Sequence, residues 1–456
     1  MMKTLTPKDS QRLPKTLVQS GVKATMNPKE DYDLLIIGGG IGGIISLYYA
    51  KKAGLRALVL ERQAEVGGLW ARLPAWQDIQ NNPIDWTLGD LPIGGADQAS
   101  ILKNIRSWVD RFELAPFIRL NTPVLRAEPA EGGWRLSTPQ CTLTARHLIA
   151  ATGGHNRLFT PAIERVDSKV REFHSSALRE PAEIRGKRVV VVGGGASAFD
   201  LLELCFANQA QKIIWVYRGL KWMSPTRKSK HLASDVRTMG RQQMLDVPLA
   251  DINRGIGDDL RGRYAKFGID AIRPEREFDI SQDQLIPGRR DMIEHFQQIE
   301  RHAGEIVQLK QNHAELANGQ KIEADMLLWG TGYELDVSYL ALPALAGITR
   351  PEQLARRCGS LFRALDAPNL FFLAPGLLES TSVTPWAYSH AARSIVAHIQ
   401  GKAALGTEPV NHKLNYFDLA KFLATQDATN FPPDTWVKTY TAMVVDHLPE
   451  QAMPIP

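Results

Sequence analysis

Apolar residues along this chain gather in short continuous runs, and several of these runs end in glycine. The first run, Asp33–Ile37, has the length of a buried strand and leads directly into the glycine-rich segment 38–43. A stretch with helical character follows as far as Ala53, and a second apolar run, Arg56–Leu60, comes next. Strand, glycine turn, helix and strand in this order predict a βαβ unit with parallel strands.

The glycines of this first turn have the spacing Gly38-x-Gly40-x-x-Gly43, which is the fingerprint of dinucleotide-binding domains. The first glycine permits the tight turn, the second lets the backbone approach a pyrophosphate, and the third lets helix and strand pack closely. Free N–H groups at the start of the helix favour phosphate. Glu61 ends the second strand, where its carboxylate can accept hydrogen bonds from ribose hydroxyls.

The same pattern recurs in the middle of the chain. The apolar strand Lys187–Val192 leads into Gly193-x-Gly195-x-x-Ala198, and a helical stretch and the strand Lys212–Tyr217 follow. Alanine in the third position is a permitted variant of the fingerprint. Two such units in one chain predict two bound dinucleotides.

The second unit differs from the first at the end of its second strand, where Arg218 takes the place of the acid. A guanidinium offers a fixed fork of donors that suits a 2′-phosphate. Lys221, Arg227, Lys228 and Lys230 follow and add positive charge; a solvated basic loop is the alternative interpretation of this cluster. An acid in the first unit and a base in the second is the arrangement expected for FAD at the first and NADPH at the second.

Two further segments, Leu148–Gly153 and Met326–Tyr333, are each an apolar strand that ends in a Thr-Gly turn. We expect both to return the chain between two nucleotide domains, with Gly153 and Gly332 beside a cofactor. Between Arg218 and Asp325 the chain is rich in Arg, Asp and Gln and is expected to form a mainly helical insertion. It closes with short strands whose Asn-Gly dipeptide, at 318–319, indicates a hairpin turn.

The sequence thus predicts an α/β protein with two dinucleotide-binding, Rossmann-like domains, the NADPH domain being inserted in the FAD domain. We expect an N-terminal extension over residues 1–30 and an NADPH domain with its helical insertion over residues 161–325. The two parts of the FAD domain are expected over residues 31–160 and 326–456.

Composition narrows the class of protein without identifying a reaction. The 456 residues are 44% hydrophobic and 23% charged, which is typical of two or three globular domains. A net charge of +5 is too small to indicate nucleic acid, and no apolar run is long enough to span a bilayer. We therefore expect a cytoplasmic protein with no membrane partner, and the sequence leaves a homo-oligomer open.

Cysteine and histidine spacing argues against several kinds of redox or metal site. Cys141, Cys205 and Cys358 lie far apart, so no CxxC pair exists for a redox disulfide, a zinc site or an iron–sulfur cluster. The histidines show no metal-ligand spacing, and no metal is expected. Sparse, odd-numbered cysteines fit a reducing compartment.

At this point the motifs resemble a known family. Glu61 followed by Gly67, Gly68, Leu69 and Trp70 reproduces the E-x5-G-G-x-W stretch of flavin-containing monooxygenases and of their relatives among the class B flavoprotein monooxygenases. The resemblance extends over roughly residues 31 to 400.

Three later segments are similar to the same family. The turn that contains Ser197 is similar to its second GxGxSA/G motif, and Gly330–Tyr333 is similar to its ATGY segment. His174 matches the histidine of the family's F-x-G-x-x-x-H-x-x-x-(Y/F) stretch, but it is the one residue of that motif that matches: Ser168, Val170 and Leu178 stand where Phe, Gly and the last aromatic residue belong. Because His174 occupies the position of the family's histidine, we expect its side chain to make an orienting hydrogen bond in the linker between the two domains.

The resemblance implies an enzyme that binds FAD and NADPH, reduces the flavin with NADPH and uses O2 to form a C4a-hydroperoxyflavin. The expected reaction is oxygenation of nitrogen or sulfur of a small organic substrate. The family's Asn beside the flavin ring is matched by Asn81, or by Asn82 with one residue of slippage, although Asn-Asn-Pro is also a turn signal. Two alternatives remain: a flavin reductase or oxidase passing electrons to oxygen, a quinone or a carrier, and a non-catalytic nucleotide sensor.

Overall fold

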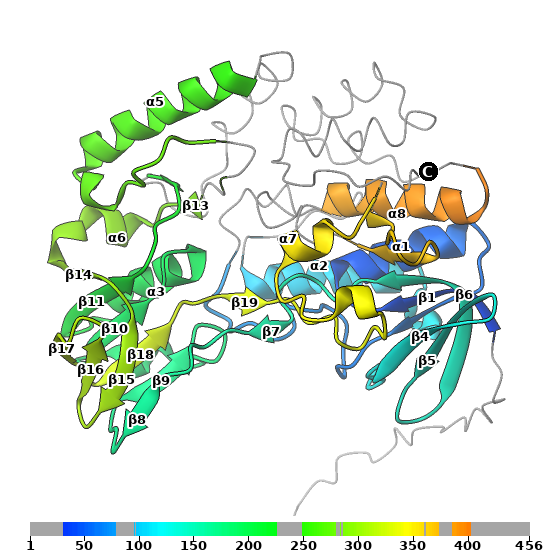
Figure 1. The fold of residues 1–456 in the computed structure, drawn as a ribbon, viewed down its shortest axis with the longest axis horizontal. Helices are drawn as coiled ribbons and strands as arrows, with labels where there is room; N and C mark the ends of the chain where they lie inside the picture. The colour runs from blue at the N-terminus through cyan, green and yellow to red at the C-terminus, as the bar shows by residue number, and fades with distance from the viewer. Residues whose placement is uncertain are drawn as a thin grey trace, which may run out of the picture.

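The computed structural model describes residues 31–78, 95, 97–225, 249–279, 283, 286–359, 362–373 and 385–402. These residues form two lobes, each built on its own sheet, and two short strands run between the lobes (Figure 1). The expected N-terminal extension lies outside the described residues.

The first lobe is built on a sheet with the strand order β3-β2-β1-β6-β5-β4, in which β20 also pairs with β6. The strands are β1 (Asp31–Ile37), β2 (Ala57–Leu60), β3 (Ile118–Arg119), β4 (Arg126–Ala130), β5 (Gly133–Ser137), β6 (Thr142–Ala150) and β20 (Leu370–Phe372). Ile37 lies opposite Leu60 and Ala150 in a parallel register. The carboxyl ends of β2, β1 and β6 therefore meet at one edge.

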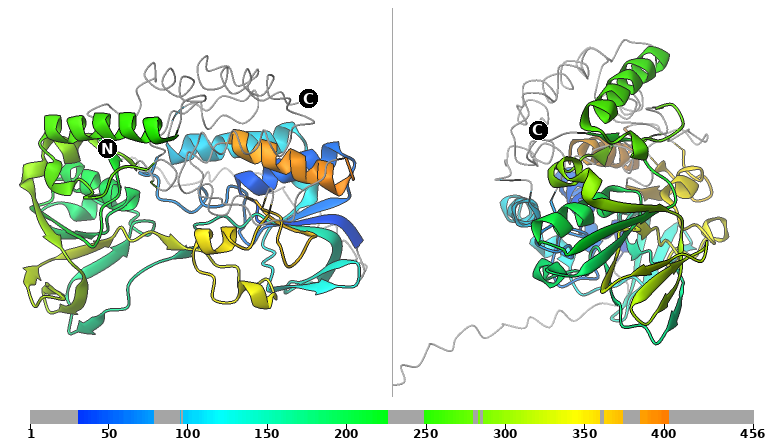
Figure 2. Two further views of the ribbon diagram at one scale, coloured as in Figure 1. Left: turned by 45° about the horizontal axis from the view of Figure 1, so that its top comes forward. Right: turned by 90° about the vertical axis from the view of Figure 1, so that its left-hand side faces the viewer.

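Helices α1 (Ile41–Lys52), α2 (Gln98–Arg111) and α8 (Pro385–Ile399) lie on one side of this sheet (Figures 1 and 2). Helix α1 is buried from Ile41 to Ala50 because it is packed against both the sheet and α8. A helix that is apolar on all sides is the expected solution for such a position. The first lobe thus combines early and late parts of the chain.

The second lobe contains a parallel sheet in the order β14-β11-β10-β18-β9. Its strands are β9 (Arg171–His174), β10 (Arg188–Val192), β11 (Lys212–Tyr217), β14 (Ile299–Ala303) and β18 (Met326–Trp329). Val189 and Val191 pack in the core cluster that contains helix α3 (Ala196–Ala207), whereas Val190 packs in a second cluster on the opposite face. This alternation follows from the two-residue period of a strand.

A small sheet covers that opposite face. It contains β8 (Glu164–Val166), β15 (Ile306–Lys310), β16 (His313–Leu316) and β17 (Lys321–Glu323). Gly319 has a φ of +83° in the turn between β16 and β17, as the Asn-Gly pair predicts.

The insertion between β11 and β14 is mainly helical where the structure describes it. It contains α5 (Leu249–Phe267), α6 (Arg290–Glu294), and the short strands β12 (Met223–Ser224) and β13 (Ile286–Pro287). The remaining elements are η2 (Ala115–Phe117), η3 (Pro181–Ile184), η4 (Asp270–Ile272), η5 (Phe296–Gln298), η6 (Pro343–Leu345), α7 (Pro351–Ala355), β7 (Arg157–Leu158) and β19 (Tyr333–Glu334).

The overall architecture is the expected one, since a second Rossmann-like sheet is inserted between β6 and β20 of the first. One predicted boundary differs from the sheet pairing. The expected boundary at residue 326 places β18 in the returning part of the first domain, but β18 pairs with β10 and β9 of the second sheet. By sheet membership the chain leaves the second lobe after Trp329.

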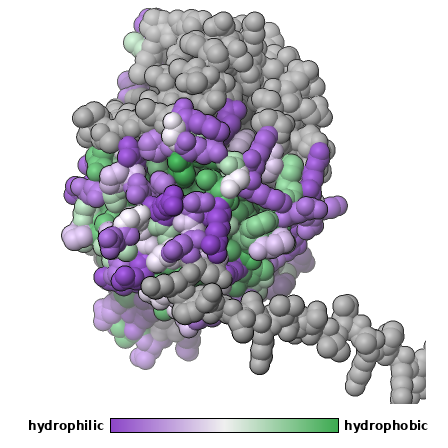
Figure 3. Space-filling view, turned by 90° about the vertical axis from the view of Figure 1, so that its right-hand side faces the viewer, coloured by the Kyte–Doolittle hydropathy of each residue, from purple (hydrophilic) through white to green (hydrophobic). Residues whose placement is uncertain are grey.

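The surface at the outer end of the first lobe is mostly hydrophilic, with smaller hydrophobic areas between (Figure 3). This distribution is typical of a solvent-facing surface. Among the described residues, no helix combines the length and apolar character needed to cross a bilayer.

Candidate functional site

A cavity of ≈ 480 Å³ opens at the carboxyl edge of the first sheet. Its wall is formed by the first glycine turn, the end of β2, the turn after it and the segment that follows β6. The predicted residues that line it are Gly38, Gly40, Glu61, Gly68, Leu69, Trp70 and Gly153. Segments far apart in sequence are thus brought together around one cavity.

The first and third glycines of the first fingerprint have no room for a side chain. Gly38 has a φ of +109°, and a Cβ there would lie 2.5 Å from the carbonyl oxygen of Ala151. A Cβ on Gly43 would lie 1.9 Å from the carbonyl oxygen of Gly38. Gly43 does not line the cavity; it allows α1 to start directly against the turn, as the third position of the fingerprint requires.

The Gly-Gly-Leu-Trp segment packs against this turn through backbone. The Gly67 N–H donates to the Gly39 carbonyl oxygen at 2.9 Å. Gly68 has a φ of +58°, and a Cβ there would approach the Cα of Gly40 to 2.9 Å. The two glycine motifs therefore form one cradle of backbone atoms, with Gly40 at the point of contact.

Glu61 is buried, with 4% of its surface exposed, and its carboxylate accepts two backbone hydrogen bonds. The Gly39 N–H donates to Oε2, and the Gln63 N–H donates to Oε1 at 2.8 Å. Each carboxylate oxygen has a further lone pair. Glu61 therefore holds the glycine turn in place and can still accept a hydrogen bond from a ribose hydroxyl.

Several cavity residues were missed by sequence reasoning. Two are cations, Arg62 and Arg72; burial, followed by the charge of Arg62, lowers the pKa of Arg72. Close cations in a partly closed site favour an anionic ligand. Others come from the segments after β2 and β3, from the linkers and from α8, and they include Gln63, Thr122, Pro123, Val124, Thr152, His155, Asn156, Asp336, Tyr339 and Tyr388. Thr122–Val124 follow the carboxyl end of a parallel strand, where ligands of such sheets bind, and this position could have marked them as site residues.

The second glycine turn repeats this geometry. Gly193 has a φ of +134°, and a Cβ there would lie 2.3 Å from the carbonyl oxygen of Gly330. A Cβ on Gly195 would meet nothing within 4 Å, so this position faces open space. Ala198 is fully buried, and a Cβ on Gly330 would lie 2.7 Å from its Cα. Ser197 is half-buried in the first turn of α3.

Arg218 directly follows β11, at the position that Glu61 has after β2. Its side chain is 65% exposed and forms an ion pair with Glu305 at 3.3 Å. Arg227, Lys228 and Lys230 lie outside the described residues, and so do Asn81 and Asn82.

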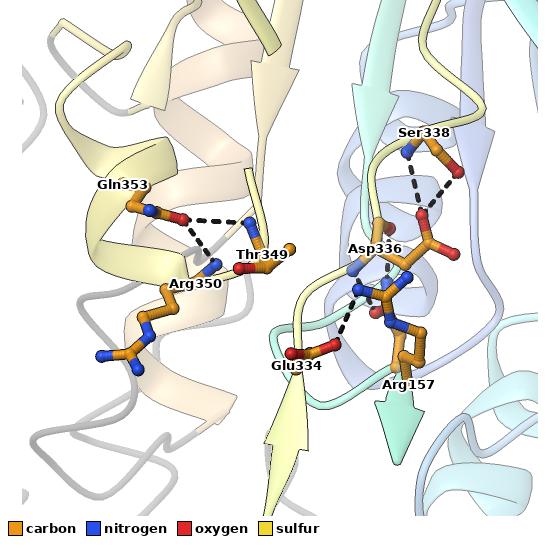
Figure 4. A network of polar contacts seen from close by, with 8 residues as sticks. Arg157, Glu334, Asp336, Ser338, Thr349, Arg350 and Gln353 are labelled. Atoms are coloured by element: carbon orange, nitrogen blue, oxygen red, sulfur yellow. Dashed lines mark hydrogen bonds and ion pairs between the residues drawn. The ribbon is translucent and has the colours of Figure 1, made fainter. Parts of the chain in front are cut away.

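The two linkers between the lobes are held together by polar contacts (Figure 4). Strands β7 and β19 pair antiparallel, and Arg157 forms an ion pair with Glu334 at 2.7 Å. The Asn156 amide donates to the Asp336 carbonyl oxygen at 2.8 Å and accepts from its N–H at 2.6 Å. Asn156 and Asp336 also line the cavity, so the first site shares a wall with the linkers.

Gly332 lies in this linker region and not in the cavity wall. Its carbonyl oxygen accepts a hydrogen bond from Phe159 N–H at 3.1 Å and lies 2.9 Å from His174 Nε2. The His174 ring also contacts Tyr333 edge to face at 5.3 Å between ring centres. These contacts are of the orienting kind expected for His174.

In the described part of the chain, no group of three His, Cys, Asp or Glu side chains is arranged to hold a metal ion. Cys141, Cys205 and Cys358 are all free, and burial raises the pKa of Cys205 and Cys358 above the ordinary value. Buried thiols of this kind are unreactive.

Comparison with known proteins finds relatives that are named as oxidoreductases and monooxygenases. A family model described as pyridine nucleotide-disulphide oxidoreductase matches residues 35–245. A 2-oxo-Delta(3)-4,5,5-trimethylcyclopentenylacetyl-CoA monooxygenase of Pseudomonas putida is 28% identical over 57% of this chain and 46% of its own length. Flavin-containing monooxygenase 5 of Cavia porcellus is 23% identical over 67% of this chain and 63% of its own length. The chain thus spans less than two thirds of either relative.

A solved structure described as OTEMO in complex with FAD and NADP has the same fold. It superimposes with a TM-score of 0.64 at 16% identity, covering 81% of this chain and 85% of that chain. In its sequence the chain is thus similar to flavin-containing monooxygenases, and its fold is that of a protein solved with FAD and NADP.

Proposed function

We propose that this protein is an NADPH-dependent, FAD-containing monooxygenase that transfers one oxygen atom from O2 to nitrogen or sulfur of a small organic substrate. The observation that carries the proposal is the pair of backbone cradles at the carboxyl edges of two Rossmann-like sheets, the first with an acid after its second strand and the second with an arginine. Relatives named as monooxygenases support the same reaction class.

The first site fits FAD. A backbone surface free of Cβ atoms at Gly38, Gly40 and Gly68 suits a pyrophosphate, and Arg62 and Arg72 add positive charge to the same cavity. Glu61 would hold the adenosine ribose. FAD supplies the redox chemistry, since it can accept a hydride and react with O2.

The second site fits NADPH. Gly193 and Gly195 would leave room for the coenzyme's pyrophosphate at the amino end of α3, and Ser197 and Ala198 lie in the first turn of that helix. Arg218 would bind the 2′-phosphate, in exchange for its ion pair with Glu305.

The chain's own residues would mainly bind, orient and exclude water. Trp70 lies in the cavity wall, where a large apolar ring helps to keep the site dry. Asn81 is proposed as the amide beside the flavin ring, by its resemblance to the family's motif. Sparse, unpaired cysteines favour a cytoplasmic, reducing location, and a net charge of only +5 favours a small-molecule substrate over nucleic acid.

The proposal is tested by mixing the FAD-bound protein with NADPH anaerobically and then with O2 in a stopped-flow spectrometer. We expect bleaching of the flavin, then the absorbance of a C4a-hydroperoxyflavin, and oxygenated products from a panel of amines, sulfides and ketones. NADPH consumption that is independent of substrate and fully recovered as peroxide would indicate a reductase or oxidase. Absence of any flavin reduction would indicate a nucleotide sensor.

A further inference from the structure

The carboxyl edge of the second sheet carries a row of four residues, each at the end of one of four neighbouring strands or directly after it. The row consists of Tyr217, Gly193, Gly330 and Ser175. Backbone hydrogen bonds continue the sheet across it: Gly193 N–H donates to Val216, Gly330 N–H donates to Val192, and Ser175 N–H donates to Trp329, at 2.8 to 3.0 Å. Ser175 is therefore in register with Gly193, the first glycine of the second fingerprint, two strands away across the sheet.

Ser175 is fully buried, and its hydroxyl has no hydrogen-bond partner in the part of the chain that the structure describes. A buried hydroxyl without a partner costs free energy, so its presence calls for an explanation. The neighbouring polar groups are already engaged. Thr331 donates through Oγ1 to the Phe159 carbonyl oxygen at 2.5 Å, and both ring nitrogens of His174 have partners.

Strand alternation gives the face on which Ser175 lies. His174 is in register with Trp329, which packs in the cluster beneath the small sheet. The next residues along both strands, Ser175 and Gly330, therefore point to the opposite face. On that face a Cβ on Gly330 would run into Ala198 in the first turn of α3. Ser175 thus lies on the face that carries the amino end of α3.

The order of the strands predicts which half of a dinucleotide would reach Ser175. From β10 the chain moves outward to β11 and β14 and then crosses back to β18, so the switch point lies between β10 and β18. A dinucleotide bound there extends over both sides. Arg218, after β11, marks the adenosine side. Ser175, directly after β9, lies two strands from β10 on the other side, about 10 Å away at the usual strand spacing.

We propose that the Ser175 hydroxyl hydrogen-bonds the carboxamide of the NADPH nicotinamide ring and so positions that ring. This inference rests on the proposed function and adds a specific coenzyme contact to it. A hydroxyl can donate to the carboxamide oxygen or accept from its NH2 group, so either orientation of the carboxamide gives Ser175 the partner that it lacks.

The turn that carries Ser175 is also in contact with the first lobe. The Trp76 indole N–H donates to the Leu178 carbonyl oxygen at 2.7 Å, and Arg179 donates to the Arg72 carbonyl oxygen at 2.6 Å. Arg72 lines the FAD cavity. Ser175 is thus close in the chain to the interface where nicotinamide and flavin have to meet. Because its hydroxyl is closed to solvent here, nicotinamide entry requires this turn or its cover to shift.

The test compares Ser175→Ala with wild type and with Ser168→Ala, a serine of the same lobe outside the row. Binding of NADP+ and of 2′,5′-ADP, which lacks nicotinamide, is measured by calorimetry on the FAD-bound protein, and flavin reduction is followed with NADPH and with NADH. For Ser175→Ala we expect a loss of NADP+ affinity of about threefold to tenfold and slower reduction by both coenzymes. Binding of 2′,5′-ADP and the unfolding midpoint should not fall, since no protein hydrogen bond is lost.

An NADP+ affinity within about twofold of wild type, or an equal loss of 2′,5′-ADP affinity, would overturn the assignment of Ser175. In either case a wild-type flavin that NADPH still reduces would leave the proposed function intact. A wild-type protein that neither binds NADP+ nor is reduced by NADPH would remove both proposals together.

Discussion

The Nε2 nitrogen of His174 lies 2.9 Å from the carbonyl oxygen of Gly332, and this contact determines the tautomer of the ring. A carbonyl oxygen only accepts, so Nε2 carries the proton. The other nitrogen, Nδ1, then accepts from the Ser176 N–H at 3.2 Å and lies 2.9 Å from the Ser176 hydroxyl. The neutral ring therefore connects β9 to the linker that contains Gly332.

This arrangement predicts a pH-dependent stability. Burial lowers the pKa of His174, and the hydrogen bond to Gly332 only partly opposes this effect. Because an unfolded histidine has a pKa of about 6.5, the unfolded chain binds more protons than the folded one between that pH and the lower pKa of the folded state. The stabilisation is complete above about pH 6.5 and is lost as the pH falls through the folded pKa.

His174→Gln should retain a hydrogen-bonding amide and lose the titration. Between about pH 7.5 and pH 5 the unfolding midpoint of the wild type should therefore fall further than that of the variant. Thermal unfolding over this range measures the difference. Parallel profiles for the two proteins would show that His174 does not contribute to the pH dependence.

Glu61→Gln is expected to weaken FAD binding about tenfold or more. The substitution removes the charge from a buried carboxylate that accepts the Gly39 and Gln63 N–H groups, and a charge-assisted hydrogen bond is worth about 1.5 to 3 kcal/mol. Flavin fluorescence titration gives the dissociation constant. Glu65→Gln is the matched control, since Glu65 is an exposed partner of Arg106; an equal effect of both changes would contradict the role of Glu61.

Gly195→Ala should separate folding from coenzyme binding. An added Cβ meets no protein atom within 4 Å, so the unfolding midpoint should be unchanged, whereas NADP+ should bind about tenfold or more weakly because the methyl group occupies its approach to the backbone. Gly262→Ala, also in open space but within α5, is the control and should leave NADP+ binding unchanged. Scanning calorimetry measures the unfolding midpoints, and titration calorimetry measures the NADP+ affinities of both variants. Unaltered NADP+ binding by Gly195→Ala would show that the pyrophosphate does not bind at Gly195.

Arg218→Ala should raise the Michaelis constant for NADPH far more than that for NADH. A charge-assisted phosphate contact is worth about 1.5 to 3 kcal/mol, which corresponds to roughly tenfold to a hundredfold. Glu305→Gln should lower the constant for NADPH, because it frees the guanidinium from its ion pair. Steady-state kinetics with both coenzymes tests the pair of variants. Equal losses with NADPH and NADH in Arg218→Ala would exclude a 2′-phosphate contact.

Local patterns were enough to predict the glycine turns and the strands and helices that flank them. Gly38 and Gly193 have positive φ angles and no room for a Cβ, so the fingerprint spacing reports a steric requirement that acts over a few residues. The strand Lys212–Tyr217 has the predicted bounds for the same reason, since a short apolar run between turn signals is a local feature.

The features that the sequence did not predict depend on contacts between distant segments. Met326–Trp329 is apolar in any context, and only its pairing with β10 and β9 assigns it to the second sheet. Asn156 and Asp336 are 180 positions apart, yet their backbone and side-chain bonds close the linker and one wall of the cavity. The ion pair between Arg218 and Glu305 also joins two segments that are far apart in sequence, so the sequence alone did not predict it.

Mass-spectrometric analysis of oxygen incorporation tests most directly whether this protein is a monooxygenase. The FAD-bound protein is given NADPH, isotopically labelled O2 and each amine or sulfide of the panel, and hydrogen peroxide is quantified in parallel. We predict that one labelled oxygen atom appears in the product and that NADPH consumed in excess of product is recovered as peroxide. Full recovery of the NADPH as peroxide with no labelled product for any substrate would contradict the proposed function.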